Sequence, residues 1–166
     1  LLFYITIIIS ACGQSNYEIA NIAYRAGDYE RAFKEFSFLS NDGNTKAQYF
    51  LGVMHEKGQY IEQDFQEAAK WYMRSAKKGY SNAQIKLARL YIQGAGVERD
   101  YLMAMKWSRR AAVQGNAEAE ASIGYMFHDG IGVNQDYTEA VKWYRKAAEK
   151  GWARAQHDLG VMYQNG

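Results

Sequence analysis

The sequence predicts an all-α solenoid built from helix-turn-helix repeats, and three observations support this fold class. Trp71, Trp107 and Trp143 are spaced 36 residues apart, and each has an Ala three positions before it and another five positions after it. The chain contains no Pro, and most of its 15 Gly residues fall where predicted helices end. Hydrophobic residues make up 48% of the chain, which is enough to bury a continuous spine between stacked helices and excludes disorder. A fixed period of this length is typical of solenoids, in which each repeat buries its apolar face against the next.

The first helix of each repeat is expected to begin near an Ala that recurs in phase: Ala47, Ala83, Ala119 and Ala155. An aliphatic residue follows four positions later and an aromatic residue or His eight positions later, which places all three on one stripe of a helix. Glycines inside this helix cost roughly 1 kcal/mol each relative to Ala, so they indicate the close approach of a neighbouring helix: Gly52, Gly124 and Gly160. Glycines at its end are expected to form left-handed caps: Gly58, Gly94 and Gly130.

The second helix of each repeat is expected to begin after an Asp whose carboxylate caps the first turn: Asp64, Asp100 and Asp136. Glu67 and Glu139 lie three residues after two of these Asp residues, which is the spacing of a capping box. The Trp residues lie with the recurring Ala residues on the predicted buried face, so we expect the indoles to form a buried spine. Lys and Arg gather toward the last turn, where they complement the helix dipole and face water.

Residues 1–12 are predicted to be the remnant of a signal peptide that ends in a lipobox. Leu1 to Ala11 is uncharged and apolar, and as a helix it would span about 16 Å, roughly half of a bilayer core. Small residues precede Cys12, the only cysteine, and this ending resembles the lipobox of bacterial lipoproteins, with Cys12 as the lipidated residue. The prediction places the chain at the bacterial cell envelope, lipid-anchored and facing the periplasm, or secreted. The alternative is a chance thiol beside a frayed apolar end.

The remaining chain is expected to divide into a leading segment and a repeat array. Residues 13–44 are predicted to form a polar tether and an atypical leading helix pair. The array over 45–166 is divided into three full repeats and a partial one: 47–82, 83–118, 119–154 and 155–166. A solenoid end needs a polar cap. Leu159 and Met162 do not provide one, so we expect the natural protein to continue beyond Gly166 with a further helix.

The charge balance and the sparse His residues limit the classes of partner. Lys plus Arg number 20 and Asp plus Glu number 18, so the chain lacks the basic excess typical of nucleic-acid binders. The three His residues show no pair at metal-ligand spacing. We therefore expect no nucleic-acid partner, no metal, no cofactor and no small-molecule substrate.

One short motif formally matches a catalytic pattern. Ser75 and Lys78 form S-x-x-K, the motif of serine acyl transfer, but the chain lacks the accompanying S-D-N and K-T-G motifs. The other repeats place Ala111 and Ala147 at the offset of Ser75, which favours a small packing position. Neither of two neighbouring His-Asp pairs has a nucleophile or third ligand at a matching spacing: His128-Asp129 and His157-Asp158. No catalytic residue is predicted.

The recurring positions read A-x-x-x-L-G-x-x-Y-x-x-G-x-G-V-x-x-D-Y-x-x-A-x-x-W-Y-x-x-A-A-x-x-G. Over 47–166 this pattern closely resembles the Sel-1-like repeat family, and it matches best from Gly130 to Gly151. Two departures are Gln59-Tyr60-Ile61 in place of the second glycine, and Ser108 in place of the Tyr after Trp107. The resemblance implies a right-handed α/α superhelix that acts as an adaptor, and bacterial members often work at the envelope or in host contact. A cysteine-rich branch is reported to bind or hydrolyse β-lactams, but this chain lacks the paired cysteines of that branch.

Positions that differ between repeats are the better functional candidates, because stacking does not dictate them. Offsets 3, 6 and 10 from the first Ala line one face of the first helix: Phe50, Val53, Lys57; Lys86, Arg89, Gln93; Ser122, Tyr125, Asp129; Asp158, Val161, Asn165. The resemblance implies that this helix lines the concave side of the superhelix. We predict that the ladder forms a groove for an extended peptide or a partner helix, with aromatic anchors at Phe50 and Tyr125 and a basic middle at Lys86 and Arg89. An ordinary solvated face is the alternative.

Taken with the lipobox, these features favour a non-enzymatic scaffold for protein–protein interaction at the bacterial cell envelope. Its partner is expected to be a protein or a peptide bound on the concave face, with membrane association through the lipid anchor. Two alternatives stay open: a cell-wall or β-lactam hydrolase of the repeat family, and a soluble regulatory adaptor.

Overall fold

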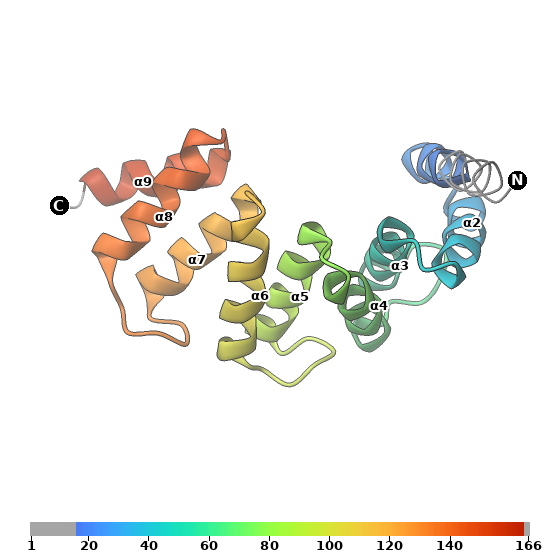
Figure 1. Ribbon diagram of the computed structural model, residues 1–166, viewed down its shortest axis with the longest axis horizontal. Coiled ribbons are helices and arrows are strands. Elements are labelled where there is room, and N and C mark those ends of the chain that lie inside the picture. The colour runs from blue at the N-terminus through green and yellow to red at the C-terminus, as the bar shows by residue number, and fades with distance from the viewer. Residues whose placement is uncertain (1–15, 165–166) are drawn as a thin grey trace, which may run out of the picture. The chain divides into compact units, whose positions relative to one another are not determined.

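The computed structural model describes residues 16–164, and all regular structure within this range is α-helical (Figure 1). The chain divides into two compact units at Lys78 and Gly79. In the first unit, residues 16–25 are helical and three labelled helices follow: α2 (Tyr29–Asn41), α3 (Thr45–Lys57) and α4 (Phe65–Lys77). The second unit contains α5 (Ser81–Gln93), α6 (Tyr101–Val113), α7 (Ala117–Asp129), α8 (Tyr137–Glu149) and α9 (Ala153–Gln164). The prediction of an all-α solenoid of helix-turn-helix repeats is confirmed.

The first helix of each repeat begins two residues earlier than predicted. α3, α5, α7 and α9 begin at Thr45, Ser81, Ala117 and Ala153, so the recurring Ala lies within the first turn. At α3 and α7 the residue before the helix is a capping Asn. Asn44 accepts a hydrogen bond from the N–H of Ala47 at 3.0 Å, and Asn116 accepts one from Ala119 at the same distance. Each Asn side chain satisfies a free N–H of the first turn. α5 begins at the same offset after Tyr80, which makes no side-chain cap bond.

The predicted caps of the second helix form, but the capping box does not. Asp64 Oδ1 accepts from the N–H of Glu67 at 3.0 Å, and Asp100 and Asp136 cap α6 and α8 in the same way. The Asp64 N–H donates to the carbonyl of His55 at 3.0 Å, so no side chain is needed to satisfy this N–H. Glu67 pairs with Lys70 instead.

The helix ends follow the predicted glycines. Gly58, Gly94 and Gly130 have φ angles of 66°, 70° and 69°, which confirms the left-handed caps. Inside the helices, a Cβ on Gly52 would lie 2.6 Å from the ring of Tyr72, and one on Gly124 would lie 2.9 Å from Tyr144. These two glycines therefore allow the predicted close approach. A Cβ on Gly160 would meet no atom of the described residues within 4 Å, and the prediction at Gly160 stays a prediction, because the helix expected to pack there was predicted to follow Gly166.

The predicted spine of tryptophans is only partly buried. Trp107 is 3% exposed, but Trp71 and Trp143 are half-buried. Arg74 lies 4.5 Å from the centre of the Trp71 ring, and Lys146 lies 4.2 Å from that of Trp143, so a cation covers the outer side of each indole. In these two repeats the residue after Trp is the one that reaches the core, because Gly52 and Gly124 of the facing helices make room for a Tyr ring.

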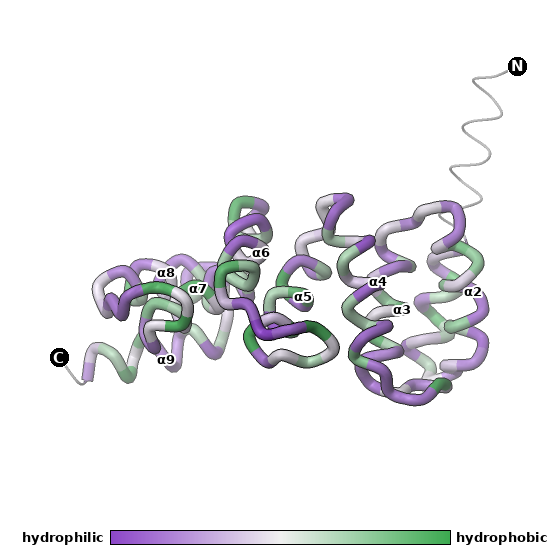
Figure 2. The backbone as a smooth tube through the Cα atoms, turned by 90° about the horizontal axis from the view of Figure 1, so that it is seen from below, coloured by the Kyte–Doolittle hydropathy of each residue, from purple (hydrophilic) through white to green (hydrophobic). Residues whose placement is uncertain are grey.

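Apolar and polar residues alternate along the described helices (Figure 2), which gives each helix one face for packing and one for solvent. Within residues 16–164, no helix combines the length and the apolar character needed to cross a membrane. Cys12 and the predicted lipobox lie outside the described residues.

Candidate functional site

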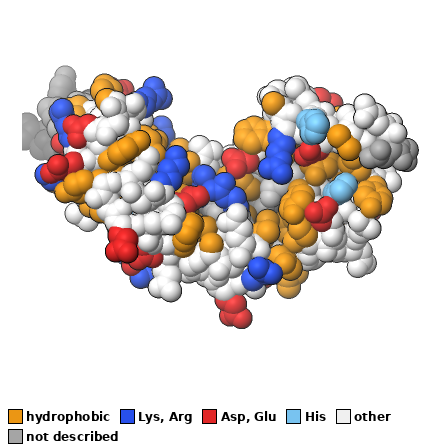
Figure 3. All heavy atoms as spheres, turned by 180° about the vertical axis from the view of Figure 1, so that it is seen from behind, with side chains coloured by type: hydrophobic (Ala, Val, Ile, Leu, Met, Phe, Trp, Pro, Cys, Tyr) orange, Lys and Arg blue, Asp and Glu red, His pale blue; other side chains and the backbone are white. Residues whose placement is uncertain are grey.

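A groove of about 380 Å³ lies on the second unit, where α5, α7 and α9 meet. It is lined by apolar, aromatic and charged side chains: Ile85, Arg89, Ile92, Gln93, Glu118, Ala121, Ser122, Tyr125, Trp152, Arg154 and Asp158. Figure 3 shows the same mixture on the exposed surface, where hydrophobic side chains are interspersed with both cations and carboxylates. A groove of this composition suits a partner with apolar anchors and polar flanks.

Several residues of the predicted ladder meet in this groove. Arg89 and Gln93 reach it from α5, Ser122 and Tyr125 from α7, and Asp158 from α9. They meet because offsets 3, 6 and 10 lie on one face of each first helix, and the first helices of successive repeats are neighbours around the groove.

The rest of the ladder lies elsewhere. Phe50 stacks on Phe36 with ring centres 4.8 Å apart and also contacts Tyr24, so it belongs to the aromatic core of the first unit and is not an open anchor. Val53 is 5% exposed, and Lys57 is exposed at the end of α3. Lys86, Asp129 and Val161 do not line the groove, and Asn165 lies outside the described residues.

The groove carries both signs of charge. Arg154 Nε lies 3.9 Å from Asp158 Oδ2, one helical turn apart on α9, which is a long and exposed pairing. Burial raises the pKa of the Tyr125 hydroxyl. Asp129 raises this pKa further, through its negative charge and through a hydrogen bond with the hydroxyl. Tyr125 is therefore a neutral phenol at physiological pH, able to present both its ring and a polar hydroxyl to a partner.

Trp152 is the groove residue that the sequence interpretation missed. It occupies the cap position of α9, because its carbonyl accepts the first helical bond from Gln156 at 3.1 Å. The corresponding residues before α3 and α7 are Asn44 and Asn116, which cap with their side chains. Exchanging such a cap for an aromatic residue costs about 1 kcal/mol. The sequence does contain a sign of this role, because Trp152 does not follow the 36-residue spacing of the other three Trp residues.

A model of the Sel1 repeat matches the chain over four successive segments, 45–80, 81–116, 117–152 and 153–166. The chain belongs to the Sel1 repeat family. Proteins built from Sel1 repeats are generally scaffolds for protein–protein interaction. No curated protein matches the chain significantly.

Two solved Sel1 structures resemble the chain in sequence as well as in fold. One is a protective antigen present in uropathogenic Escherichia coli strains, with 35% identity and a TM-score of 0.86. The chain aligns over 93% of its own length but spans 34% of that protein. The other is a Sel1 repeat protein from Oxalobacter formigenes, with 36% identity, a TM-score of 0.81, and coverage of 89% and 59%. Cysteine rich protein B of Helicobacter pylori shares the fold, at 20% identity, a TM-score of 0.60, and coverage of 80% and 95%.

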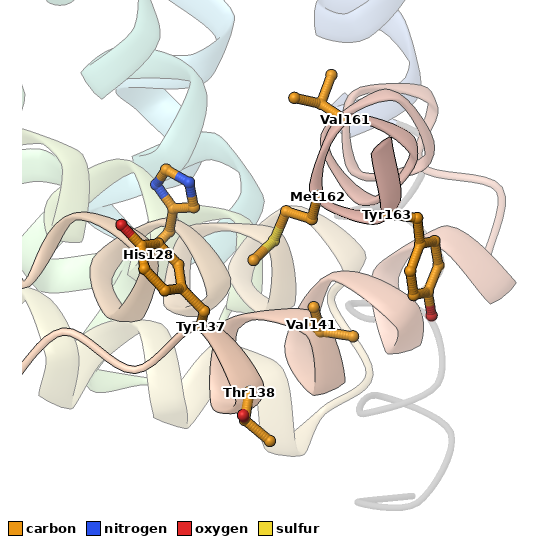
Figure 4. A pocket seen from close by; sticks show the side chains of 7 residues that line it. All are labelled: His128, Tyr137, Thr138, Val141, Val161, Met162 and Tyr163. Carbon is orange, nitrogen blue, oxygen red and sulfur yellow. The ribbon is translucent and has the colours of Figure 1, made fainter. Parts of the chain in front are cut away.

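A second hollow, of about 500 Å³, lies between the last Sel1 helices (Figure 4). His128 and Tyr137 contact each other edge to face with ring centres 5.3 Å apart, and Met162 extends from α9 toward α8. In the preceding repeat Tyr101 takes the place of Tyr137. A Cβ on Gly132 would lie 2.6 Å from the Tyr101 Cβ, so the loop at Gly132 packs closely against the start of α6.

The residues with catalytic spacing do not assemble a reactive site. Ser75 is fully buried, and its hydroxyl donates to the carbonyl of Thr45 at 2.7 Å, so it joins α4 to α3. His128 Nδ1 is hydrogen-bonded to Asp129, but Ser75 lies in the other unit. Among residues 16–164, no group of three or more His, Cys, Asp or Glu side chains is placed to hold a metal ion.

Proposed function

We propose that this Sel1 repeat protein is an adaptor of the bacterial cell envelope that holds an extended segment of a partner protein in the groove of its second unit. The observation that carries the proposal is the composition of this groove. Tyr125 and Trp152 remain 39% and 36% exposed within it, beside Arg154 and Asp158. Exposed aromatic rings flanked by charges are typical of the anchors of a protein interface.

Trp152 supports the proposal because its ring is 36% exposed and lines the groove. The position before the first helix of a repeat is held by Asn at α3 and α7, and by Tyr80 at α5, which makes no side-chain cap bond. An aromatic residue at this position is therefore compatible with the repeat, and the one before α9 faces the groove. Backbone carbonyls and N–H groups of an extended peptide have polar partners nearby in Gln93 and Ser122.

The envelope location rests on the sequence of residues 1–12 and on one relative. A relative described as a protective antigen of uropathogenic Escherichia coli strains is 35% identical to this chain. Lipidation at Cys12 would place the repeats at the membrane surface and leave their groove open to partners.

Affinity selection from a random peptide library tests the groove directly. The decisive variant is Trp152→Asn, which restores the cap found before α3 and α7. We expect peptides selected on the wild-type protein to bind this variant at least tenfold more weakly, while its thermal stability is equal or higher.

The matched control is Tyr137→Ala, which removes an aromatic residue that is 54% exposed outside the groove. Peptide binding should survive in this control. Equal losses in the two variants, or selected peptides that bind both as tightly as wild type, would rule out the groove.

Lipidation has a separate test. In a bacterial host, palmitate labelling should be lost in Cys12→Ser, and globomycin should block processing of the wild-type precursor. Unlabelled wild-type protein would refute the anchor and leave the peptide groove unaffected.

A further inference from the structure

The outward side of α6 carries an exposed stripe that the peptide groove does not use. Leu102, Lys106, Arg109 and Val113 follow one another at steps of four, three and four, which places them on one face of the helix. Leu102 is 73% exposed and Val113 is 89% exposed, and both cations between them are exposed. Neither α5 nor α7, the neighbours of α6, covers this face.

The charge of this face is all of one sign. α6 contains Lys106, Arg109 and Arg110 and no acidic residue. Arg110 lies over the Trp107 ring at 4.7 Å, whereas Lys106 and Arg109 form no ion pair with the described residues. Asp100, just before the helix, is engaged in capping the N–H of Met103. The positive charge is therefore available to a partner.

The corresponding stripes of the other repeats are different. On α8 the four positions hold Thr138, Lys142, Arg145 and Glu149. Both cations are engaged there, because Lys142 pairs with Glu139 at 2.9 Å and Arg145 donates to the Tyr163 hydroxyl at 2.6 Å. On α4 the two outer positions hold Gln66 and Lys77. Stacking of Sel1 repeats therefore requires neither exposed apolar residue of α6.

We propose that this face of α6 docks on an anionic phospholipid surface. Leu102 and Val113 are about 16 Å apart along the axis, so a helix lying flat on a bilayer inserts both at the level of the headgroups. Lys106 and Arg109 then meet lipid phosphates between these two contacts. Neither the groove nor the second hollow takes a residue from α6, so this face suits a flat surface better than an extended peptide. A second copy presenting the same stripe would bring like charges together.

Vesicle co-sedimentation of the full-length Cys12→Ser chain tests the proposal without lipidation. Because residues 1–11 are uncharged, their contribution is common to phosphatidylcholine vesicles and to mixed phosphatidylglycerol vesicles. The difference between the partition coefficients on anionic and on neutral vesicles therefore reports the contribution of α6. We expect Lys106→Glu/Arg109→Glu to lower the partition coefficient on anionic vesicles about tenfold or more.

The control is Lys142→Glu/Arg145→Glu, which makes the same change in net charge on α8. It should retain most of the anionic preference, with circular dichroism confirming the fold of both variants. Equal losses would assign binding to net charge and overturn the proposal, as would a wild-type chain without anionic preference.

An environment-sensitive NBD label locates the contact. Attached to Leu102→Cys in the Cys12→Ser chain, it should shift to the blue on anionic vesicles. The same label on Thr138→Cys should not shift. A shift at both positions, or at neither, would refute docking through α6. Polyglutamate that binds with the same variant dependence while vesicles do not would assign the face to an acidic protein and would also overturn the proposal.

Discussion

The helix pairs α5–α6 and α7–α8 have helices of equal length, but they fill the space between these helices differently. In α7–α8, Gly124 lies under the ring of Tyr144, which is 4% exposed. The corresponding residues of α5–α6 are Ala88 and Ser108, both fully buried. A larger residue on the first helix thus accompanies a smaller one on the second. The two pairs do not fill the same volume, because Ala and Ser together are far smaller than Gly and Tyr, and Trp107 is 3% exposed where Trp143 is half-buried. The comparison teaches that different residues fill this crossing in the two repeats.

A polar pair between the same helices also differs between the two repeats. In α7–α8, Lys150 Nζ lies 2.6 Å from Glu120 Oε1. In α5–α6, Gln114 Nε2 donates to Gln84 Oε1 at 2.8 Å. One repeat thus uses an ion pair where its neighbour uses two amides, and the first repeat combines Gln48 with Lys78 at these positions.

The largest expected effect on stability comes from removing the Tyr144 ring from the α7–α8 crossing. Tyr144→Ser reproduces the residue of α6 without the accompanying Ala, and it leaves a cavity beside Gly124. We expect a loss of about 3–5 kcal/mol in the free energy of unfolding, measured by urea denaturation and far-UV circular dichroism. Tyr137→Ser, on the same helix but 54% exposed, should cost less than about 1 kcal/mol. Similar losses in the two variants would show that the buried ring of Tyr144 contributes no more to stability than the exposed ring of Tyr137.

The effect of Gly124→Ala on the free energy of unfolding should change sign with the residue at position 144. Gly124→Ala should destabilise by about 1–3 kcal/mol, because its Cβ would lie 2.9 Å from Tyr144. In the Tyr144→Ser background the same change should stabilise, since the clash is gone and Ala favours the helix. The chain offers a matched control in Gly160→Ala, where a Cβ meets nothing within 4 Å and a gain of about 0.5–1 kcal/mol is expected. A gain for Gly124→Ala with Tyr144 present would disprove the close contact.

The polar pair should behave as a unit. Lys150→Gln leaves the carboxylate of Glu120, which is 5% exposed, without its cation, and we expect a loss of about 1–2 kcal/mol. Adding Glu120→Gln recreates the amide pair of α5–α6 and should recover most of this loss. Additive costs in a double-mutant cycle would show that the two positions are independent.

The smallest effect extends the comparison to the first unit, where His55 takes the place of Tyr91 and Phe127. Burial lowers the pKa of His55, and this outweighs Glu67 and Asp64, which raise it. The folded state therefore disfavours the protonated form. The contribution of His55 to stability is complete above the unfolded pKa of 6.5 and is lost as pH falls through the lower folded pKa.

His55→Phe should flatten this pH dependence, which we expect to be worth less than about 1 kcal/mol in thermal unfolding followed from about pH 8 to about pH 5. His157→Phe, at an exposed position, serves as the control. An unchanged slope in His55→Phe would assign the pH dependence to other groups.

The 36-residue spacing was sufficient to predict the helices and their caps, but not which aromatic residue of each pair faces the core. Trp71 and Tyr72 both fall within a helical apolar stripe, and periodicity cannot separate neighbours on one helix. The facing Gly52 decides in favour of Tyr72, and that contact joins residues 20 positions apart. All four first helices begin two residues before the recurring Ala, including α5, where Tyr80 makes no side-chain cap bond. The recurring Ala marks a buried position inside the first turn and not the helix start.

The groove was predicted in part for a related reason. Arg89, Gln93, Ser122 and Tyr125 share one helical face, so a ladder of offsets finds them. Trp152 and Arg154 come from the start of α9, and no offset along the first helix includes them. Phe50 fits the ladder equally well, but a leading helix of different sequence covers it with Tyr24.

The main-chain bond from each capping Asp to the preceding helix has a consequence for how such arrays change length. Asp64, Asp100 and Asp136 donate to His55, Tyr91 and Phe127, each across a nine-residue span. Duplication of one 36-residue module reproduces this hydrogen bond, and deletion of a module removes it together with its repeat. Insertion of a single amino acid inside the nine-residue span would break it. Gene rearrangement in whole modules is therefore the tolerated route to longer and shorter relatives.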